Sequence, residues 1–218
     1  APEEALDLGN TTQMNLKVGG RGYLGQGYST AATILGHSVK AKTTGTVSGG
    51  MEVTETNSGG GAPSAIRMQS GNIEFHTASS GTSGATFDSE KLRITSGGNI
   101  GIGENSPSNL LHVKVSDTGV APHSSAQIVL ERSGTNYLQF LTAANGTSGI
   151  LFGDANDNDV GQIKYDLNVP AMQFNIEGTE RARIDSSGNL QVVRNVSIDN
   201  NGELAVFEDD TSLGYTNS

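Results

Sequence analysis

The sequence predicts an all-β protein, an elongated array of short antiparallel β-hairpin modules. One eight-residue phrase recurs, as RITSGGNI at 93–100, RIDSSGNL at 183–190 and SIDNNGEL at 197–204. Elsewhere apolar residues alternate with polar ones in short runs, the pattern of strands with two unlike faces. Glycine supplies 30 of the 218 residues, about twice its usual share, and aromatic residues only 5%. A chain with so few bulky side chains favours thin sheets over a wide core.

The first predicted strands flank a glycine-rich segment. The run NLKV at 15–18 precedes GRGYLG at 20–25, which satisfies the G-x-G-x-x-G pattern of dinucleotide-binding turns. No helix opening follows, and Lys40 and Lys42 stand where an acidic ribose partner is required. The segment therefore predicts a turn between strands and no bound cofactor. Tyr23 and Tyr28 offer faces for a sugar, although lone tyrosines more often cover sheet edges.

The repeated phrase predicts a β-hairpin turn. In RIDSSGNL, Asp185 and Gly188 occupy the first and fourth positions of a type I turn, and an apolar residue flanks the turn on each side. If Gly188 needs a positive φ, Gly188→Val destabilises the protein by about 1 kcal/mol or more. The equivalent pairs in the other copies are Thr95 with Gly98 and Asp199 with Gly202.

A longer repeat surrounds two of these turns. EKLRITSGGNIGI from Glu90 aligns without gaps to ERARIDSSGNLQV from Glu180. In both copies basic residues alternate with apolar or small ones before the turn. We expect the apolar side of these strands to be buried and the basic side, with Arg93 and Arg183, to face water.

Other alternating runs predict further strands, separated by Gly, Ser, Thr and Asn clusters. No convincing amphipathic helix interrupts them. His112 alternates with Leu111 and Val113, so we expect its side chain on the solvent face of its strand. The predicted strands are IRM at 66–68, NIEF at 72–75, LLHVKV at 110–115, QIVL at 127–130, YLQF at 137–140, QIKYDLNV at 162–169 and MQFNI at 172–176.

A second, quieter repeat suggests where the modules divide. SPSNLLHV at 106–113 and APEEALDL at 1–8 share the spacing of a proline, a leucine and a second aliphatic residue. We expect a first module over 1–106 that starts partway through a repeat, and a second over 107–218 that changes character after about 190. Internal repeats of this kind are typical of elongated arrays.

Charge and composition exclude several classes of partner. The net charge of −10 argues against a nucleic-acid partner and against docking on anionic membranes, because both need clustered Lys and Arg. No run approaches the roughly 18 apolar residues of a membrane span, so no membrane insertion is expected. The chain has no cysteine, so disulfides cannot stabilise it.

The motif search predicts no catalytic, cofactor-binding or metal-ligating residues. GDANDND at 153–159 begins like a calcium loop, but Asp159 and Tyr165 stand where glycine and glutamate are required, which favours a solvated turn. No nucleophile elbow is present. A pair of carboxylates that cleaves glycosides stays an open alternative, although the sequence singles out no particular pair. The histidines share no metal-ligand spacing; they are His37, His76, His112 and His123.

One stretch resembles a known family. EKLRITSGGNIGIGENSPSNLLHV at 90–113 is similar to the repeat of bacteriophage tail fibres and related virion appendages, and the resemblance extends over most of 60–192. The second copy departs from it after Asn189, where the G-I-G and S-P elements are lost. The matching positions are Glu90, Arg93, Ile94, Gly98, Asn99, Gly101, Ile102, Gly103, Ser106, Pro107, Leu111 and Val113.

The resemblance implies a parallel homotrimeric fibre with β-prism-like or β-helix-like modules. Trimerisation would cover strand edges and stabilise thin sheets by mass action. The family motif is architectural, so it carries over no catalytic residue. The expected partners are further copies of the chain, other virion or fibre components, and a glycan or receptor on the host surface.

The leading functional expectation is therefore a non-enzymatic segment of a viral tail fibre, external to the cell and serving as shaft or adhesion module for host attachment. One alternative is a tailspike segment that degrades surface polysaccharide, which a clustered acid pair lining a groove would favour. Another is a subunit of a cellular adhesin or extracellular filament built from similar β repeats.

Overall fold

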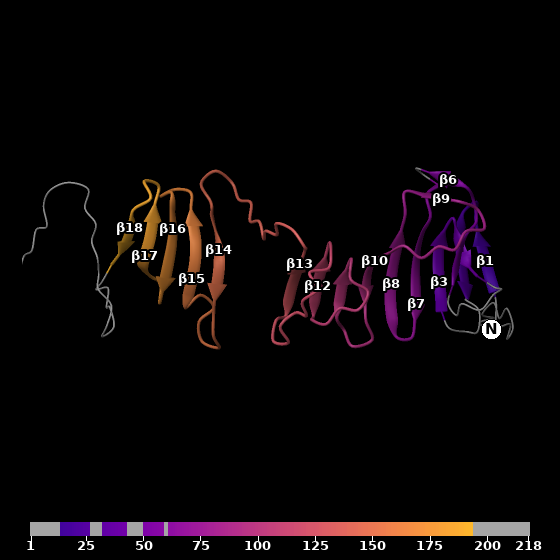
Figure 1. Cartoon of the computed structure of the whole chain (residues 1–218), viewed down its shortest axis with the longest axis horizontal. Coiled ribbons are helices and arrows are strands. Elements are labelled where there is room, and N and C mark those ends of the chain that lie inside the picture. Colours follow the sequence, from indigo (N-terminus) through magenta and orange to yellow (C-terminus); the bar gives the residue numbers. More distant parts are fainter. Residues whose placement is uncertain (1–13, 27–31, 43–49, 59–60, 194–218) are drawn as a thin grey trace, which may run out of the picture. The chain divides into compact units, whose positions relative to one another are not determined.

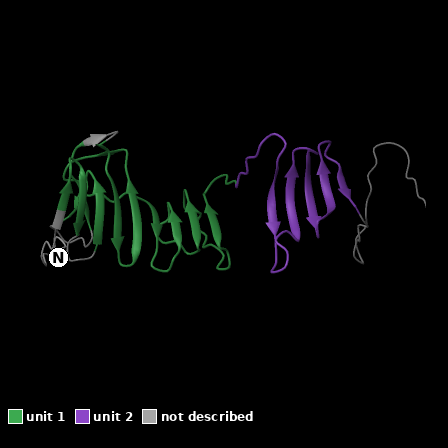
Figure 2. Cartoon of the chain, turned by 180° about the vertical axis from the view of Figure 1, so that it is seen from behind, with its two compact units in different colours: residues 1–137 green, residues 138–218 purple. Residues whose placement is uncertain are grey.

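The all-β prediction is confirmed. The computed structural model describes residues 14–26, 32–42, 50–58 and 61–193. Within these stretches the chain forms strands and no helix (Figure 1). Figure 2 shows that the chain divides into two compact units, residues 1–137 (unit 1) and residues 138–218 (unit 2). Three predicted features lie outside the described residues, namely the repeat at 1–8, Tyr28 and the turn at 197–204.

Unit 1 is built on a nine-stranded sheet with the strand order β1-β2-β3-β7-β8-β10-β11-β12-β13. Neighbours from β1 to β11 are antiparallel. The strands are β1 (Met14–Val18), β2 (Gly22–Gln26), β3 (Ala32–His37), β7 (Ser64–Gln69), β8 (Asn72–Thr77), β10 (Glu90–Ile94), β11 (Ile100–Ile102), β12 (Leu111–Lys114) and β13 (Ile128–Glu131).

The last three strands of this sheet are parallel, unlike the antiparallel hairpins expected from the sequence. Residues 103–110 return the chain from the end of β11 to the start of β12. Asn99 Nδ2 fixes this return by donating to the Pro107 carbonyl at 2.9 Å. A Cβ at Gly101 would collide with the backbone oxygen of Glu104, so the close approach requires glycine. The glycine-rich repeat thus builds a crossover as well as a turn.

A small apolar core covers one end of this sheet. Strands β4 (Val39–Ala41) and β5 (Met51–Val53) form a two-stranded sheet of their own, as do β6 (Asn57–Ser58) and β9 (Ser80–Gly81). The buried cluster contains Ala32, Ile34, Val39, Ala41, Met51, Val53, Ala65 and Phe87. Of the nine strands of the main sheet, only β3 and β7 contribute described side chains to this cluster.

Unit 2 is an antiparallel meander in which each strand pairs with the next. Among its described residues, only Ala171 is a buried apolar side chain, so a single copy of this unit has no apolar core. The strands are β14 (Thr147–Phe152), β15 (Gly161–Asp166), β16 (Ala171–Ile176), β17 (Thr179–Asp185) and β18 (Leu190–Val192).

Both described copies of the repeated phrase are the predicted hairpin turns. Gly98 N donates to Thr95 O at 2.9 Å between β10 and β11, and Gly188 N donates to Asp185 O at 3.0 Å between β17 and β18. The φ angles are +88° at Gly98 and +85° at Gly188. The Asp185 carboxylate also accepts the Asn189 N–H at 3.0 Å, which lowers the pKa of Asp185.

Two sequence predictions need comment. YLQF at 137–140 is not a strand, because no neighbouring segment pairs with its backbone within the described residues. The predicted module boundary after Ser106 falls inside unit 1, in the crossover between β11 and β12, whereas the units divide after Tyr137. The 1–106 and 107–218 modules remain a prediction about the sequence repeat.

The turn geometry gives a matched pair of substitutions. Gly98→Ala should lower the free energy of unfolding by about 1 kcal/mol, because an L side chain is strained at that φ although nothing lies within 4 Å of the new Cβ. Gly188→Val should do the same for the second turn. Gly97→Ala is the control, since Gly97 is not in the left-handed region. Equal denaturant midpoints for Gly98→Ala and Gly97→Ala would contradict the assignment.

Candidate assembly interface

An unbroken row of apolar side chains crosses the main sheet of unit 1. Each strand contributes one residue, and the strand register places each residue beside the next. We call this set the apolar row. In sheet order it contains Leu16, Leu24, Leu35, Ile66, Phe75, Leu92, Ile102, Val113 and Leu130.

The face that carries the apolar row is open in the single chain. Leu35 is 54% exposed and Leu24 46% exposed, although both belong to a sheet. A second row lies beside the first, two residues along each strand, and contains Met68, Ile73, Ile94, Ile100, Leu111 and Ile128. Continuous exposed apolar surface of this extent marks an interaction site in a soluble protein.

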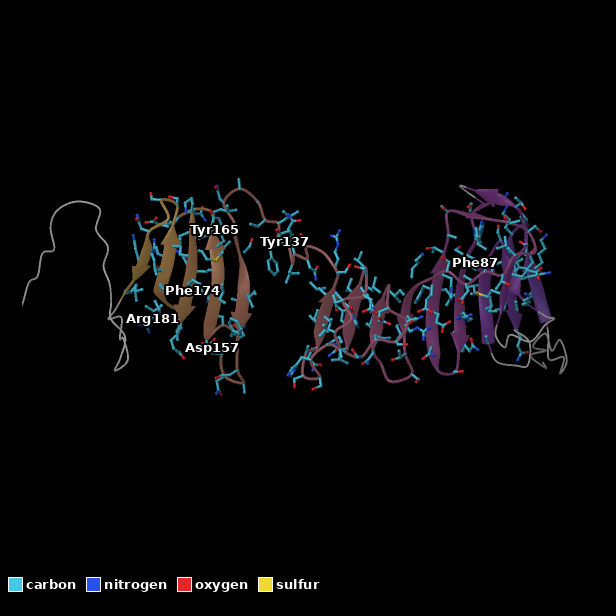
Figure 3. The ribbon with its side chains drawn as sticks, viewed as in Figure 1. Phe87, Tyr137, Asp157, Tyr165, Phe174 and Arg181 are labelled. Atoms are coloured by element: carbon cyan, nitrogen blue, oxygen red, sulfur yellow. The ribbon has the colours of Figure 1, made fainter. Side chains whose placement is uncertain are left out.

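Unit 2 repeats the arrangement. Tyr165 and Phe174 lie on one face of its sheet, where neighbouring strands supply further large apolar side chains (Figure 3). Phe174 is 40% exposed, and Leu190 is 68% exposed. The exposed members of this face are Ile150, Phe152, Ile163, Tyr165, Met172, Phe174, Ile176, Ile184, Leu190 and Val192.

An apolar hollow of about 500 Å³ lies on this face of unit 2. Ile150, Ile163, Tyr165 and Met172 line it from the sheet, and Phe140 lines it from the segment before β14. The residues predicted as the YLQF strand therefore contribute a side chain to the apolar face. Phe140 is itself half exposed, so the hollow remains open.

In the single chain, the buried and exposed faces of the strands are the reverse of those expected from the sequence. The side chain of Arg93, predicted to face water, is 16% exposed, whereas Ile94, predicted to be buried, is 36% exposed. The alternation is correct, but the polar side chains cover one another through ion pairs, while no other described segment covers the apolar face. In unit 2, Gln173 is 6% exposed beside the open side chain of Phe174.

The polar face of unit 1 carries a charged cluster across three strands. Arg67 on β7, Glu74 on β8 and Arg93 on β10 are register partners. Arg67 Nε donates to Glu74 Oε2, and an Arg93 guanidinium nitrogen lies 3.1 Å from Glu74 Oε1. Arg93 also pairs with both oxygens of Glu90, at 2.7 and 2.5 Å, which raises the pKa of Arg93.

Unit 2 keeps part of this arrangement. Arg183 pairs with Glu180 at 2.5 and 2.7 Å, as Arg93 does with Glu90, which raises the pKa of Arg183. Gln173 stands opposite Arg183 in the register position that Glu74 holds opposite Arg93. The gapless sequence repeat thus corresponds to a structural repeat of the E-x-x-R pair, and the central carboxylate is specific to unit 1.

A second charged cluster lies beside β12 and β13, and it corrects the prediction for His112. His112 is 3% exposed rather than solvent-facing, because its Nε2 lies 2.9 Å from Glu131 Oε2. Lys114 Nζ lies 2.9 Å from Glu104 Oε2 and 3.7 Å from Glu131 Oε2. The Thr118 N–H and His112 lower the pKa of Glu131. Burial acts to raise the pKa of Glu104, but the Lys114 ammonium and the Ser106 N–H together lower it.

The two motif interpretations that favoured turns are confirmed. Gly20 and Arg21 of GRGYLG lie in the turn between the antiparallel strands β1 and β2, and the remaining residues of the motif, 22–25, belong to β2. Asp154 Oδ1 accepts the N–H groups of Asn156 and Asp157 at 2.7 and 2.9 Å, which makes a solvated Asx turn between β14 and β15 and lowers the pKa of Asp154. The Lys17 ammonium lies over the Tyr23 ring, with Nζ 5.8 Å from the ring centre.

Sequence reasoning missed both charged clusters. Glu74 and His76 are two residues apart on a strand, which places them on one face, but their partner Glu90 comes from another strand whose register depends on a bulge between Glu90 and Leu92. The available signal was the alternation of Glu74 and His76 with Ile73 and Phe75.

Comparison with family models, with curated proteins and with solved structures gives no match. In the part of the chain that the structure describes, no helix is long and apolar enough to cross a membrane. The functional argument therefore depends on the geometry of the chain itself.

The buried cluster of unit 1 gives a second matched comparison. Glu74→Ala should lower the free energy of unfolding by about 3 kcal/mol, because Arg67 keeps only a 3.7 Å contact with Asp88 and Arg93 loses one of its two partners, in a largely buried setting. Glu55→Ala removes a solvent-exposed pair with Arg21 and should cost less than about 1 kcal/mol. Chemical denaturation of both variants measures the difference. Equal losses would show that the Glu74 cluster contributes no more than a surface pair.

Proposed function

We propose that this chain is a non-enzymatic structural segment of a homotrimeric phage tail fibre or related virion appendage, acting as shaft or adhesion module for host attachment. The observation that carries the proposal is the apolar face of each unit, which no other part of the described chain covers. In the assembly, the same face of two further copies covers it.

Self-association is the economical way to cover these faces. The apolar row takes one residue from every strand of the nine-stranded sheet, so a cover must be as long as the sheet itself. An identical chain offers that length and the same pattern. Three copies that turn their apolar faces toward a common axis bury all faces equally, whereas a pair of flat sheets would leave strand edges open.

The magnitudes agree with this proposal. Burying a large apolar side chain that is already half covered contributes roughly 1 kcal/mol. The exposed apolar side chains of unit 2 together then contribute on the order of 10 kcal/mol for each chain, before the entropic cost of association. Because unit 2 has no apolar core of its own among the described residues, this contribution is comparable to its whole folding stability.

The tailspike alternative has one specific observation in its favour. A polar cleft of about 560 Å³ in unit 1 is lined by three acids, Asp88, Glu90 and Glu104. Glycoside cleavage needs a carboxylic acid that stays protonated near neutral pH. Glu90 is paired with Arg93 through both of its oxygens, and the pKa of Glu104 is lowered by Lys114. Both carboxylates are thus engaged by cations, which favours the non-enzymatic proposal.

Solution mass tests the assembly. Light scattering of the purified chain should give three times 22.5 kDa. Phe174→Lys should shift the mass toward the monomer, because it places a charge in the apolar face of unit 2. Thr147→Lys is the control and should leave the mass unchanged, because Thr147 is exposed on β14 and lies on the sheet face opposite the apolar face. A stable, folded monomer of the unaltered chain would contradict the proposal.

Incubation with polysaccharide from the host envelope tests the absence of catalysis. We expect no sustained release of reducing ends. Turnover that disappears on Glu90→Gln or Glu104→Gln would instead establish the tailspike function. Electron microscopy of native particles distinguishes a virion fibre from a cellular adhesin or filament. Attachment to a capsid or tail supports the fibre, and attachment to a cell supports the adhesin or filament.

A further inference from the structure

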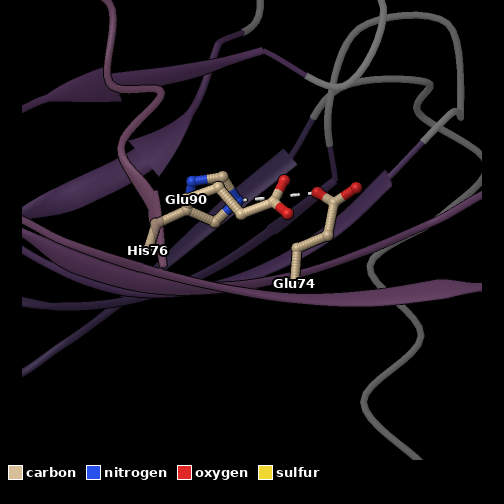
Figure 4. Close-up of side chains that lie close together, drawn as sticks. All are labelled: Glu74, His76 and Glu90. Carbon is tan, nitrogen blue, oxygen red and sulfur yellow. Dashed lines mark ion pairs between the residues drawn. The ribbon is translucent and has the colours of Figure 1, made fainter. Parts of the chain in front are cut away.

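Three side chains with metal-binding atoms converge on the polar face of unit 1 (Figure 4). Glu74 and His76 are two residues apart on β8, so they point to the same side of the sheet. Glu90 on β10 is the register partner of His76. One ligand atom from each of the three lies within 4.8 Å of the others. The arrangement is therefore set by backbone pairing between two adjacent strands.

The imidazole of His76 has no hydrogen-bond partner at either ring nitrogen within the described structure, although the side chain is fully buried. Its Nε2 is directed toward Glu74 Oε2 at 3.5 Å, beyond hydrogen-bond length, and its ring packs beside Phe87. Leaving a buried polar group unpaired is costly, and such groups in native proteins mark an unseen partner or a functional role.

We propose that Glu74, His76 and Glu90 bind a divalent transition-metal ion, with Zn²⁺ as the ion that fits the donor set best. A bound ion would supply the missing partner of His76. The site would take three protein ligands and leave one position toward the polar cleft, which Glu90 and Asp88 also line.

The donor set selects the class of metal. One imidazole nitrogen with two carboxylates matches the ligands of zinc sites, whereas calcium and magnesium prefer oxygen ligands alone. The His76 imidazole is fully buried and has no hydrogen-bond partner within the described structure, so a ring nitrogen is available to a metal. Glu74 is 3% exposed, so water would compete little for its side of the site.

The surrounding groups have the arrangement that supports a metal ligand. Asp88 Oδ1 lies 3.8 Å from His76 Nδ1, close enough that a small rotation would give that nitrogen a carboxylate acceptor, as metal-bound histidines usually have. Arg67 and Arg93 hold the carboxylates of Glu74 and Glu90 in place.

The second cluster of unit 1 provides an internal control. Glu104, His112 and Glu131 also place ligand atoms within 4.8 Å of one another. However, His112 Nε2 is already bonded to Glu131, and the Lys114 ammonium lies against Glu104 at 2.9 Å. Because His112 Nε2 already has a partner and neither ring nitrogen of His76 has one, we assign the metal to the His76 cluster alone.

The test uses the full chain, dialysed against a chelator and titrated with ZnCl₂ by isothermal titration calorimetry. We expect one equivalent of Zn²⁺ per chain, whatever the oligomeric state, and a higher melting temperature when zinc is bound. His76→Asn should abolish binding. Asp88→Asn should weaken it by about 10- to 100-fold, as loss of a carboxylate behind a metal-bound histidine does. His112→Asn should bind zinc like the unaltered chain.

Glu90→Gln keeps the test decisive if His76→Asn fails to fold, because the Glu90 side chain is at the cleft, 15% exposed, and glutamine keeps its size while it removes the charge that a metal and Arg93 require. Circular dichroism of each variant checks folding. The proposal is overturned if the unaltered chain takes up no zinc, if binding survives in both His76→Asn and Glu90→Gln, or if only His112→Asn removes it.

Discussion

The structure depends on one constraint, that a β-strand sends successive side chains to opposite faces. In this chain one set is apolar and the other is polar or charged in almost every strand of both units. The polar set can cover itself, because long charged side chains such as Arg67, Glu74 and Arg93 pair across neighbouring strands. The apolar set cannot do so within one chain, and Leu35 and Phe174 remain open.

This constraint explains why burial is distributed so unusually. Among the described residues, the apolar core of unit 1 is confined to the end of the sheet where β4 and β5 fold back over β3. Over the described residues 138–193, unit 2 has no strand that folds back, so its meander keeps an apolar face and a polar face without a core between them. In the proposed assembly, association supplies stability that an ordinary domain obtains internally, so that assembly and folding become a single thermodynamic problem.

The sequence predicted the parts of the fold that depend on local chemistry. The turns at Gly98 and Gly188 followed from glycine in a type I turn, and most strands followed from period-2 alternation. Its prediction of the covered face was wrong for the single chain, because coverage depends on ion pairs with other strands, as between Arg93 and Glu74. Nor could it place His112 beside Glu131, since parallel pairing of β12 with β13 sets that contact. The Glu74 cluster was missed for the same reason, because β10 supplies Glu90.

The central claim is that the apolar face is covered in the protein as it exists in solution. The chain contains no cysteine, so a single introduced thiol reports its own accessibility. With Phe174→Cys the account predicts slow reaction with a thiol reagent in native buffer and fast reaction after denaturation. Thr147→Cys, on the opposite face of the same sheet, should react fast in both conditions. Equally fast labelling of the two native variants would contradict the account, because the apolar face would then be open to water.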